Sequence, residues 1–477
     1  MLGRLISFGL FYFSAKSQSL LNNKTYSHIA ARMKFLDKYR DDFKLNLKLA
    51  LPIMAGQLGQ ITVYLADNLM VGRLGADALA AVSLAVAIIA VPIVVGFGIA
   101  FALPTLISEA DGAGETKKIS QYFKHSLIIN TAIGVISCAL LLFGLPLLEH
   151  LGQDPEVVKL AKTYIVMSAI GMIPMMIFIT FRGYSDGMSE TKPPMIAMLL
   201  GNVLNVWLNY LLIFGKFGFP ALGVEGAALA SLIARVAMIV FIVIALLKWK
   251  DLWSYIEECN FRVYQKQMFS KILKIGIPSS LQMFFEISAF SGAALIMGMV
   301  SKNAQAAHQI SINLSSITFM ICSGLAMAST IRVGNQLGKK DYKAMRNAGI
   351  SAFIQVTAIM AIFSLMFVAF RAYLPLLYID DSQVIEIASL LLIFAAIFQI
   401  PDGLQVAALS ALRGLQDVKI PTYITFFSYY IVGIPISYFA AINFGMGAPG
   451  VWLGLLIGLF LSASLLIYRF YRLSARY

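Results

Sequence analysis

The chain has 477 residues, of which 59% are hydrophobic and only 13% are charged, and its formal net charge is +13. Soluble domains carry roughly a quarter charged residues, so this composition excludes an ordinary soluble protein, which could not bury so much apolar surface. The placement of the basic residues, described below, also excludes nucleic acid as the partner.

The segment before the first long apolar run is basic and polar. Within it, Leu5–Phe13 is apolar but too short to cross a bilayer, and it resembles a weak signal sequence. The basic residues between Lys34 and Lys44 instead favour retention on the inner side of the membrane. We therefore predict a cytoplasmic extension over residues 1–44, with Met33 as an alternative start.

Twelve long apolar segments follow, each with about the 20 residues that a helix needs to cross a bilayer while bonding its own backbone. They are continuous runs, unlike the alternating strands of a membrane barrel, and so predict an all-α integral membrane protein. The predicted spans are 46–70, 78–107, 121–145, 157–181, 193–214, 223–247, 270–298, 305–330, 347–370, 384–411, 419–442 and 449–470.

The basic residues between and beside these spans predict the topology. With both termini on one face, that face receives 29 of the 37 lysines and arginines. Lysine and arginine concentrate on the cytoplasmic side of membrane proteins, so we predict that both termini are cytoplasmic. The opposite face receives Arg73, Lys159, Lys162, Lys216, Lys302 and Arg371.

The two halves of the chain repeat each other at an offset of 226 residues, for example at Pro52 and Pro278 or at Gly112 and Gly338. Six spans per half is an even number, so both copies enter the membrane from the same side, an arrangement that recurs in transporters. The predicted parts are the N-lobe over 45–247, a cytoplasmic linker over 248–269, the C-lobe over 270–471 and a tail over 472–477.

Three carboxylates fall inside predicted spans: Asp67 in the first, Glu286 in the seventh and Asp402 in the tenth. An intramembrane carboxylate costs roughly 2.5 to 3.5 kcal/mol on insertion scales, so one that persists usually faces a cavity and binds or relays a cation. Pro401, directly before Asp402, frees a helix carbonyl that a cation can use. These residues predict that transport is coupled to Na⁺ or H⁺. If the ion is Na⁺, Glu286 and Asp402 are the expected ligands.

Polar residues accompany the carboxylates. Asn202, Asn205 and Asn209 share one face of the fifth span, and Gln309 and Asn313 lie one helical turn apart in the eighth. They predict a polar cavity or part of a cation site, and hydrogen bonding between helices explains them equally well. No catalytic, zinc or nucleotide motif is present in the sequence, so we expect neither enzymatic activity nor a cofactor.

At these residues the chain resembles the multidrug and toxic compound extrusion (MATE) family, in particular its NorM-type branch, over about residues 45–470. The similar stretches are Leu65-Ala-Asp-Asn-Leu-Met-Val-Gly72, Gly276-Ile-Pro278 with Phe284-Phe-Glu286, Ala306-Ala-His-Gln309, Arg332-Val-Gly334 with Leu337-Gly338, and Asp402-Gly-Leu-Gln405 with Leu412-Arg-Gly414.

The resemblance implies two six-helix lobes and export of cationic amphipathic compounds in exchange for Na⁺ or H⁺. It implies that Glu286 and Asp402 form the cation site of the C-lobe and that Asp67 is the matching aspartate of the N-lobe, with Asn205 and Asn209 beside it. One departure is Phe398, where some NorM-type sequences have a tyrosine; the missing hydroxyl weakens the case for sodium.

We therefore expect a monomeric, cation-coupled antiporter of the inner membrane that exports cationic drugs or toxic metabolites by alternating access, surrounded by membrane lipid. The alternative is a flippase of lipid-linked precursors. Flippases often line their cavity with basic residues, whereas the predicted spans here hold little positive charge beyond Lys48 and Arg235. An intramembrane enzyme is disfavoured because the sequence shows no nucleophile paired with a base. A scaffold is disfavoured because it would not require three carboxylates inside the membrane.

Overall fold

The computed structural model describes residues 23–150 and 152–477. The predicted signal-like segment Leu5–Phe13 lies outside the described residues. The chain divides into two units, Met1–Leu45 and Asn46–Tyr477. Helix α2, Asn23–Gly72, passes through the boundary between them, and the description below concerns the second unit.

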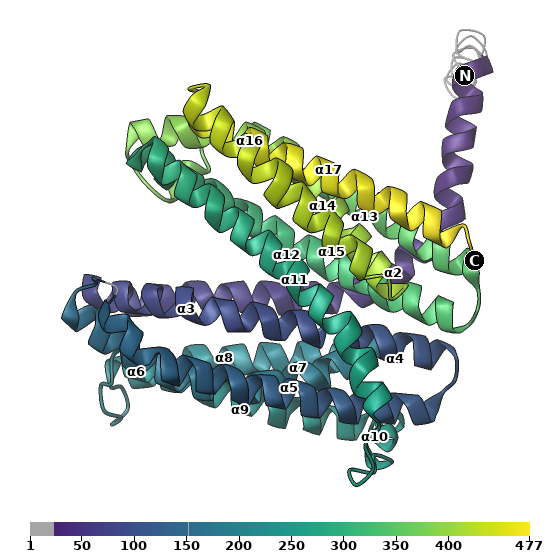
Figure 1. Cartoon of the computed structure of the whole chain (residues 1–477), viewed down its shortest axis with the longest axis horizontal. Helices are drawn as coiled ribbons and strands as arrows, with labels where there is room; N and C mark the ends of the chain where they lie inside the picture. Colours follow the sequence, from purple (N-terminus) through teal and green to yellow (C-terminus); the bar gives the residue numbers. More distant parts are fainter. Residues whose placement is uncertain (1–22, 151) are drawn as a thin grey trace, which may run out of the picture. The chain divides into compact units, whose positions relative to one another are not determined.

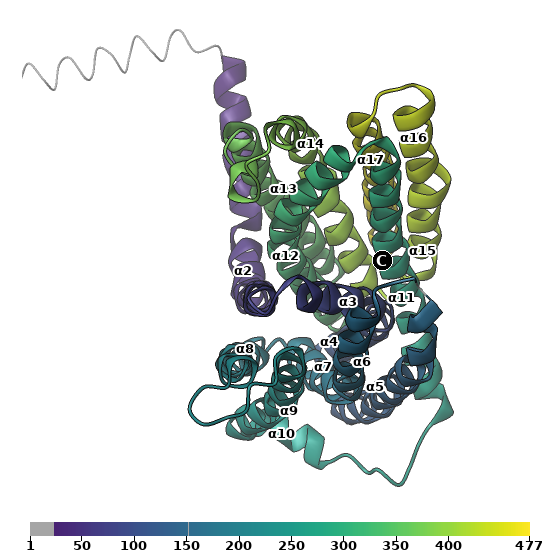
Figure 2. The same ribbon diagram turned by 90° about the vertical axis from the view of Figure 1, so that its left-hand side faces the viewer.

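The second unit is helical throughout its described length apart from short connections (Figures 1 and 2). After α2, the first half contains α3 (Ala76–Ala100), α4 (Ala102–Gly112), α5 (Thr116–Gly144), η1 (Leu145–His150), α6 (Pro155–Ile170), α7 (Met172–Gly187), α8 (Lys192–Phe214) and α9 (Val224–Lys248). After α10 (Lys250–Glu257), the second half contains α11 (Lys266–Val300), α12 (Lys302–Gly338), α13 (Tyr342–Phe370), η2 (Pro375–Leu377), α14 (Ser382–Gly414), α15 (Lys419–Phe426), η3 (Phe427–Gly433), α16 (Ile434–Tyr438), η4 (Phe439–Asn443) and α17 (Ala448–Ser474).

Within the described residues, these elements form twelve segments long and apolar enough to cross a membrane, as predicted. The ends differ by several residues. The fourth segment reaches Gly187 rather than residue 181, and the eighth reaches Gly338 rather than residue 330. The helices continue past the apolar runs because their last turns pack inside the protein, where hydrophobicity no longer marks the end of a helix.

Proline explains the interruptions in three of the spans. Pro104 and Pro174 each lie four residues after the last residue of the preceding helix, Ala100 and Ile170. A proline ring clashes with the carbonyl four residues earlier and cannot donate to it, which breaks the helix at that residue. In the eleventh span, the wider turns of η3 precede Pro435 for the same reason.

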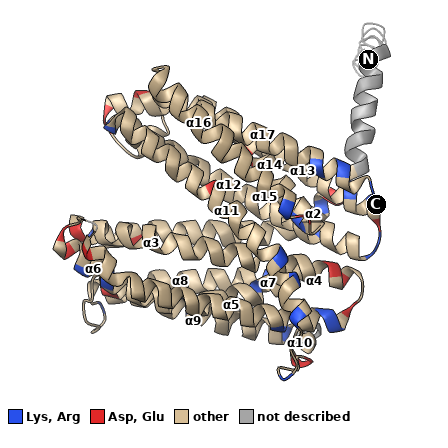
Figure 3. Cartoon of the chain, in the orientation of Figure 1, with Lys and Arg blue, Asp and Glu red and all other residues tan. Residues whose placement is uncertain are grey.

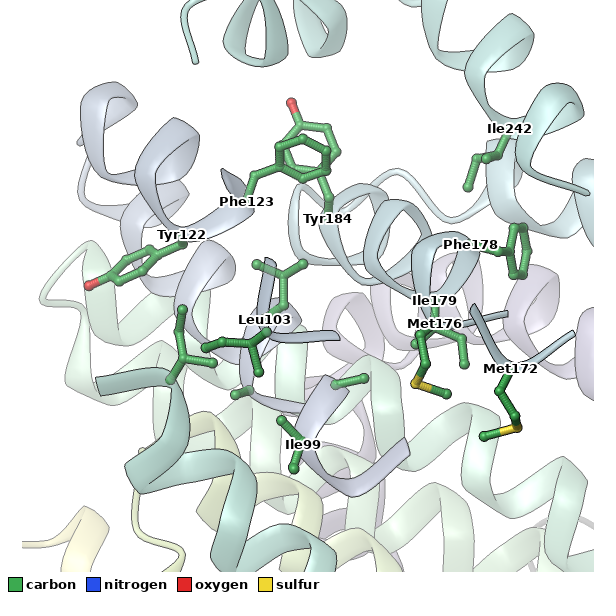
Figure 4. Close-up of a cluster of buried hydrophobic side chains, with 14 of the residues drawn as sticks. Ile99, Leu103, Tyr122, Phe123, Met172, Met176, Phe178, Ile179, Tyr184 and Ile242 are labelled. Atoms are coloured by element: carbon green, nitrogen blue, oxygen red, sulfur yellow. The ribbon is translucent and has the colours of Figure 1, made fainter. Parts of the chain in front are cut away.

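The first half has a core of large apolar side chains between α4, α5, α6 and α7 (Figure 4). The ring of Phe123 lies 5.1 Å from that of Tyr184 in an edge-on contact. The Tyr184 hydroxyl donates a 2.6 Å hydrogen bond to the Leu252 carbonyl in α10. The linker between the halves is therefore partly helical and is fixed to the first half.

In the second half, α14 packs against α12, α13 and α17. Trp452 of α17 is fully buried, with its ring 5.6 Å from that of Phe398 in α14. Two apolar clusters fill this half, one on each side of the polar residues of α14 described below.

The first helix of each half, α2 and α11, also packs against the other half. A Cβ built on Gly98 of α3 would lie 2.2 Å from the Ser280 Cα in α11, and one built on Gly324 of α12 would lie 2.6 Å from the Met54 side chain in α2. Both pairs are related by the 226-residue offset, because Gly98 corresponds to Gly324 and Met54 to Ser280. Residues that repeat in the sequence therefore make equivalent contacts in the two halves. The halves correspond to the two predicted six-helix lobes.

One end of the second unit carries the turns at 113–115, 188–191, 249–265, 339–341 and 415–418 together with the C-terminus, and we call it the linker face. The other end, with the turns at 73–75, 215–223 and 371–381, is the loop face. Figure 3 shows that Lys and Arg gather towards the linker face.

Candidate cation and substrate site

Two cavities of about 360 Å³ each lie next to one another in the second unit. One is enclosed by the first half alone, and we call it the N-lobe cavity; the other lies between the halves, and we call it the central cavity. Their shared lining residues are Gln60, Phe97, Ile179 and Arg182. A ligand in one cavity is thus within reach of side chains that also line the other.

Asp67 lines the N-lobe cavity from α2, and α8 supplies its polar partners. The buried Asn209 amide donates to the Asp67 carboxylate and also to the Asn205 side-chain oxygen at 3.1 Å. Asn205 in turn donates a 3.2 Å hydrogen bond to the Ser231 hydroxyl in α9. The four residues form one polar chain across three helices, which brings Asp67, Asn205 and Asn209 together.

This chain leaves oxygen atoms available for a cation. The Asn209 side-chain oxygen is buried and has no hydrogen-bond partner among the residues that the structure describes. Asn202, which also lines the cavity, has a buried amide nitrogen without a partner. Buried polar atoms are nearly always satisfied, and hard cations prefer carboxylate and amide oxygens. The Asp67 carboxylate and the Asn209 oxygen are of the ligand type that hard cations prefer.

Glu286 of α11 lines the central cavity. Around it are the apolar side chains of Met283, Phe319, Met320 and Met327. Within the described residues, Glu286 forms no ion pair, and Arg413, which lines the same cavity, is the positive charge that acts on it. Methionine side chains adapt to ligands of different shape, and a carboxylate among them suits a cationic amphipathic molecule.

The cavities also contain arginines, which corrects the prediction that the spans hold little positive charge. Arg182 and Arg413 line the central cavity, and Arg235 lines the N-lobe cavity. Arg182 and Arg413 were placed outside the predicted spans because polar residues end the apolar runs there. Their helices continue to Gly187 and Gly414, and this carries both side chains into the protein.

Asp402 lies elsewhere in the second half. It is buried within α14 and is not among the residues that line either cavity. Gln399 and Gln405, three residues to either side on the same helix face, are fully buried. Gln399 accepts a 2.9 Å hydrogen bond from Thr318, and Gln405 accepts one of 2.6 Å from the Tyr429 hydroxyl.

Asp402 is thus part of a buried polar cluster with Gln399, Gln405, Thr318 and Tyr429, which sequence analysis missed. The spacing of three residues on either side of Asp402 could have predicted that both glutamines share its helix face. No feature of the sequence distinguished Tyr429 as a member of this cluster, because tyrosines are common in membrane helices. Asp402 does not line the central cavity, but it lies close enough to Glu286 for the two negative charges to act on each other.

Gln309 and Asn313 are exposed on α12, where Gln309 donates a 3.0 Å hydrogen bond to Asn313. Neither residue is among those that line the two cavities. Phe398, at the position of the expected hydroxyl, is buried against the rings of Phe290 and Trp452. Among the described residues, no group of three or more His, Cys, Asp or Glu side chains is arranged to hold a metal ion.

Polar contacts join the two halves at the linker face. Glu109, near the end of α4, accepts from Lys271 of α11 at 3.3 Å and from Gln416 after α14. The Asn335 amide of α12 donates to Asp111 at 2.7 Å. These contacts tie the end of α4 to α11, to α12 and to the turn after α14 in the other half.

The chain is similar to known transporters over nearly its whole length. A model of the MatE family matches residues 52–211 and again residues 278–439, two segments that begin 226 residues apart. A probable multidrug resistance protein NorM of Bradyrhizobium diazoefficiens is 34% identical over 441 residues, covering 91% of this chain and 94% of that protein. The corresponding protein of Pasteurella multocida is 32% identical over 457 residues, covering 93% and 97%.

Solved structures share the fold. One described as the outward-facing conformation of a multidrug resistance MATE family transporter of the MOP superfamily has a TM-score of 0.84 at 22% identity, covering 91% of this chain and 96% of that one. A MOP superfamily transporter from Pyrococcus furiosus, described as having a binding pocket of reverse polarity, also has a TM-score of 0.84, at 23% identity and with the same coverage.

Proposed function

Because the chain belongs to the MatE family of multi-pass membrane transporters, we propose that it is an antiporter that exports cationic amphipathic drugs or toxic metabolites in exchange for Na⁺ or H⁺. The observation that carries this proposal is the central cavity, where Glu286 and several methionine and phenylalanine side chains line one space between two repeated helix bundles. A carboxylate in such surroundings attracts organic cations, and the apolar lining accepts their ring systems.

We place the protein in the inner membrane with the linker face towards the cytoplasm. The concentration of lysine and arginine at that face supports this orientation. No part of the proposal requires a second subunit, and we treat the transporter as a monomer.

Alternating access is supported by the repeat-related contacts between the halves. The polar contacts of Glu109 and Asp111 join the halves at the linker face, and we assign them as the closure of this side. These contacts are partly buried, and near a protein surface such contacts are individually worth about 1 kcal/mol, so a ligand that binds the alternative state better can break them. Separation of α4 from α11, α12 and α14 would then open the central cavity towards the linker face.

Coupling uses the carboxylates of both halves. Asp67 with Asn205 and Asn209 supplies a set of oxygens for a cation next to the central cavity, and Asn202 completes the polar wall. Glu286 accepts either the organic cation or the coupling cation, which makes the two compete. Asp402 and its buried cluster form a second candidate position for Na⁺ or H⁺ inside the C-lobe.

The alternative function is flipping of lipid-linked precursors. The specific observation in its favour is the presence of Arg182, Arg235 and Arg413 in the cavities, because guanidinium groups bind phosphate well. The carboxylates favour the antiporter, since they would repel a phosphate at the same cavities.

The test is ethidium uptake into proteoliposomes that enclose DNA, with either Na⁺ or H⁺ concentrated in the lumen. Uptake driven by one gradient and lost in Glu286→Gln supports the antiporter and identifies its coupling cation. Glu386→Gln, which changes an exposed glutamate of α14, is the matched control and should retain uptake. No uptake under either gradient, together with movement of a fluorescent phospholipid between leaflets, would replace the antiporter with the flippase.

A further inference from the structure

A pocket separate from the two cavities lies at the loop face. Its volume is about 530 Å³, and its walls are the last turns of α2 and α8 with the turns that follow them. None of its lining residues lines the N-lobe cavity or the central cavity. The ends of α2 and α8 lie at the edge of the second unit (Figure 2), and Leu69 in the pocket wall is 72% exposed. This pocket, which we call the α2–α8 pocket, therefore opens outward, towards the surrounding lipid.

The wall from α2 is apolar along its length and positive at its end. Ala66, Leu69, Met70 and Arg73 line the pocket, and their spacing of three and four residues places them on one side of the helix. At 1.5 Å per residue, Ala66 lies about 10 Å further along the helix from the loop face than Arg73. The α2 wall therefore changes from basic at the membrane surface to apolar within the membrane.

The wall from α8 has the same order. Tyr210 and Phe214 lie one turn apart with ring centres 6.2 Å from each other, and Lys216 follows in the turn after the helix. Both basic residues thus lie at the loop-face end of an apolar and aromatic slot. A phospholipid is built in the same order, with a charged headgroup at the membrane surface and acyl chains that run towards its middle.

The two positive charges of the α2–α8 pocket have no counter-charge in the protein. No acidic residue lines the pocket, and Arg73 and Lys216 are exposed and form no ion pair within the described residues. Lys159 and Lys162 of the same face both pair with glutamates. Only six of the 37 lysines and arginines were assigned to this face, and two of those six share this pocket. Basic pockets between membrane helices attract anionic headgroups.

We infer that the α2–α8 pocket binds one anionic phospholipid of the leaflet at the loop face. Arg73 and Lys216 donate to its phosphate, and one acyl chain lies in the slot between α2 and α8. The lipid bridges these helices next to the contact between Asp67 and Asn209, and so stabilises that contact. The site depends on the position of the chain in a membrane and not on the proposed export function. Basic residues that only anchored the helix ends would attract anionic lipid equally at every position of this face.

The test is native mass spectrometry of the purified full-length protein, offered equal amounts of phosphatidylglycerol and phosphatidylcholine. We expect the wild type to retain one phosphatidylglycerol with a preference of about tenfold or more, because the choline group of the other lipid cancels the charge of its phosphate. The double variant Arg73→Gln with Lys216→Gln should lose the preference. The matched control is Lys302→Gln with Arg371→Gln, which removes two exposed charges of the same face outside the pocket and should keep the preference.

A second variant, Ala66→Trp, fills the apolar slot and keeps both charges, so it should also reduce the retention of phosphatidylglycerol. It keeps the inference testable if the double variant does not fold. Four results would overturn the inference: equal retention of the two lipids by the wild type, equal losses in the two double variants, full retention in Ala66→Trp, or displacement of the lipid by millimolar inorganic phosphate. The last result would assign the pocket to free phosphate. None of them would affect the proposed export, which ethidium uptake tests separately.

Discussion

A Cβ atom built on Gly112 would lie 1.9 Å from the carbonyl oxygen of Asn335, so the ends of α4 and α12 touch through their backbones. An equivalent contact occurs in the opposite direction, since a Cβ on Gly338 would lie 2.0 Å from the Glu109 carbonyl oxygen. Gly338 follows Gly112, and Asn335 follows Glu109, by the same 226 residues. The two halves therefore meet at the linker face around a local two-fold relationship, which only residues without a side chain permit.

We predict that Gly112→Ala destabilises this closure. The added methyl group forces the backbones of α4 and α12 apart, and overpacking of this kind costs about 1 to 3 kcal/mol. A lower thermal unfolding temperature of the purified protein would show it. Gly144→Ala is the control, because a Cβ there meets nothing within 4 Å. Equal unfolding temperatures for the two variants would mean that the close approach is not maintained in the membrane.

We predict that Glu109→Gln opens the linker face. The change removes the charge that holds Lys271 and weakens the contact with Gln416. The expected effect is about 1 kcal/mol, enough for a several-fold rise in access to the central cavity. Labelling of Ser323→Cys by a membrane-impermeant maleimide from the linker face, in a chain lacking its three native cysteines, measures this access. The control is Lys118→Gln, which breaks an exposed ion pair with Glu115 within the first half and should not alter the labelling rate. If labelling in this control rises as much as in Glu109→Gln, the Glu109 contacts are not a specific closure.

We predict that Asp67→Asn keeps the fold but impairs coupling. Asparagine retains an oxygen that can accept from Asn209, whereas the negative charge that attracts a cation is lost. Transport should fall by about tenfold, equivalent to about 1.4 kcal/mol, with little change in unfolding temperature. Asn68→Ala is the neighbouring control, since Asn68 donates only to the Tyr64 carbonyl of its own helix. Full transport by Asp67→Asn would remove the N-lobe site from the mechanism.

We predict that Asp402→Asn abolishes coupled transport although Asp402 does not line the central cavity. If the buried cluster around it holds the coupling cation, loss of the charge uncouples the gradient from substrate movement and leaves dye binding at Glu286 intact. Gradient-driven ethidium uptake and dye affinity, measured on the same preparation, separate these two effects. Loss of dye affinity with retained uptake would contradict the assignment.

We predict that Cys259, in the linker, reacts slowly with thiol reagents. Burial raises the pKa of its thiol from 9.0 to about 11, because the thiolate loses hydration there. Since the thiolate is the reactive form, the rate near neutral pH should be about a hundredfold lower than in the unfolded chain. N-ethylmaleimide labelling of a variant that retains only Cys259, before and after denaturation, gives the ratio. A ratio near one would show that the linker is undocked from α5 in solution.

The sequence by itself determined the membrane class, the twelve spans and the repeat. Lipid requires about 20 apolar residues per helix whatever the tertiary fold, so local composition carries this information. The sequence also placed Asn205 and Asn209 on one face of a helix, because residues four apart share a face, whereas their grouping with Asp67 was implied by the family resemblance.

Only the tertiary structure decided which charges share a cavity. Arg413 lies beyond an apolar run, and its place in the cavity that Glu286 lines depends on how α14 packs against α12 and on the contact with Phe101 from the other half. Conversely, Asp402 has an intramembrane position like that of Glu286, yet the rotation of α14 buries it among Gln399, Gln405 and Tyr429. Hydrophobicity along a chain reports depth in the membrane, whereas the direction of a side chain around its helix is set by packing between helices that lie hundreds of residues apart.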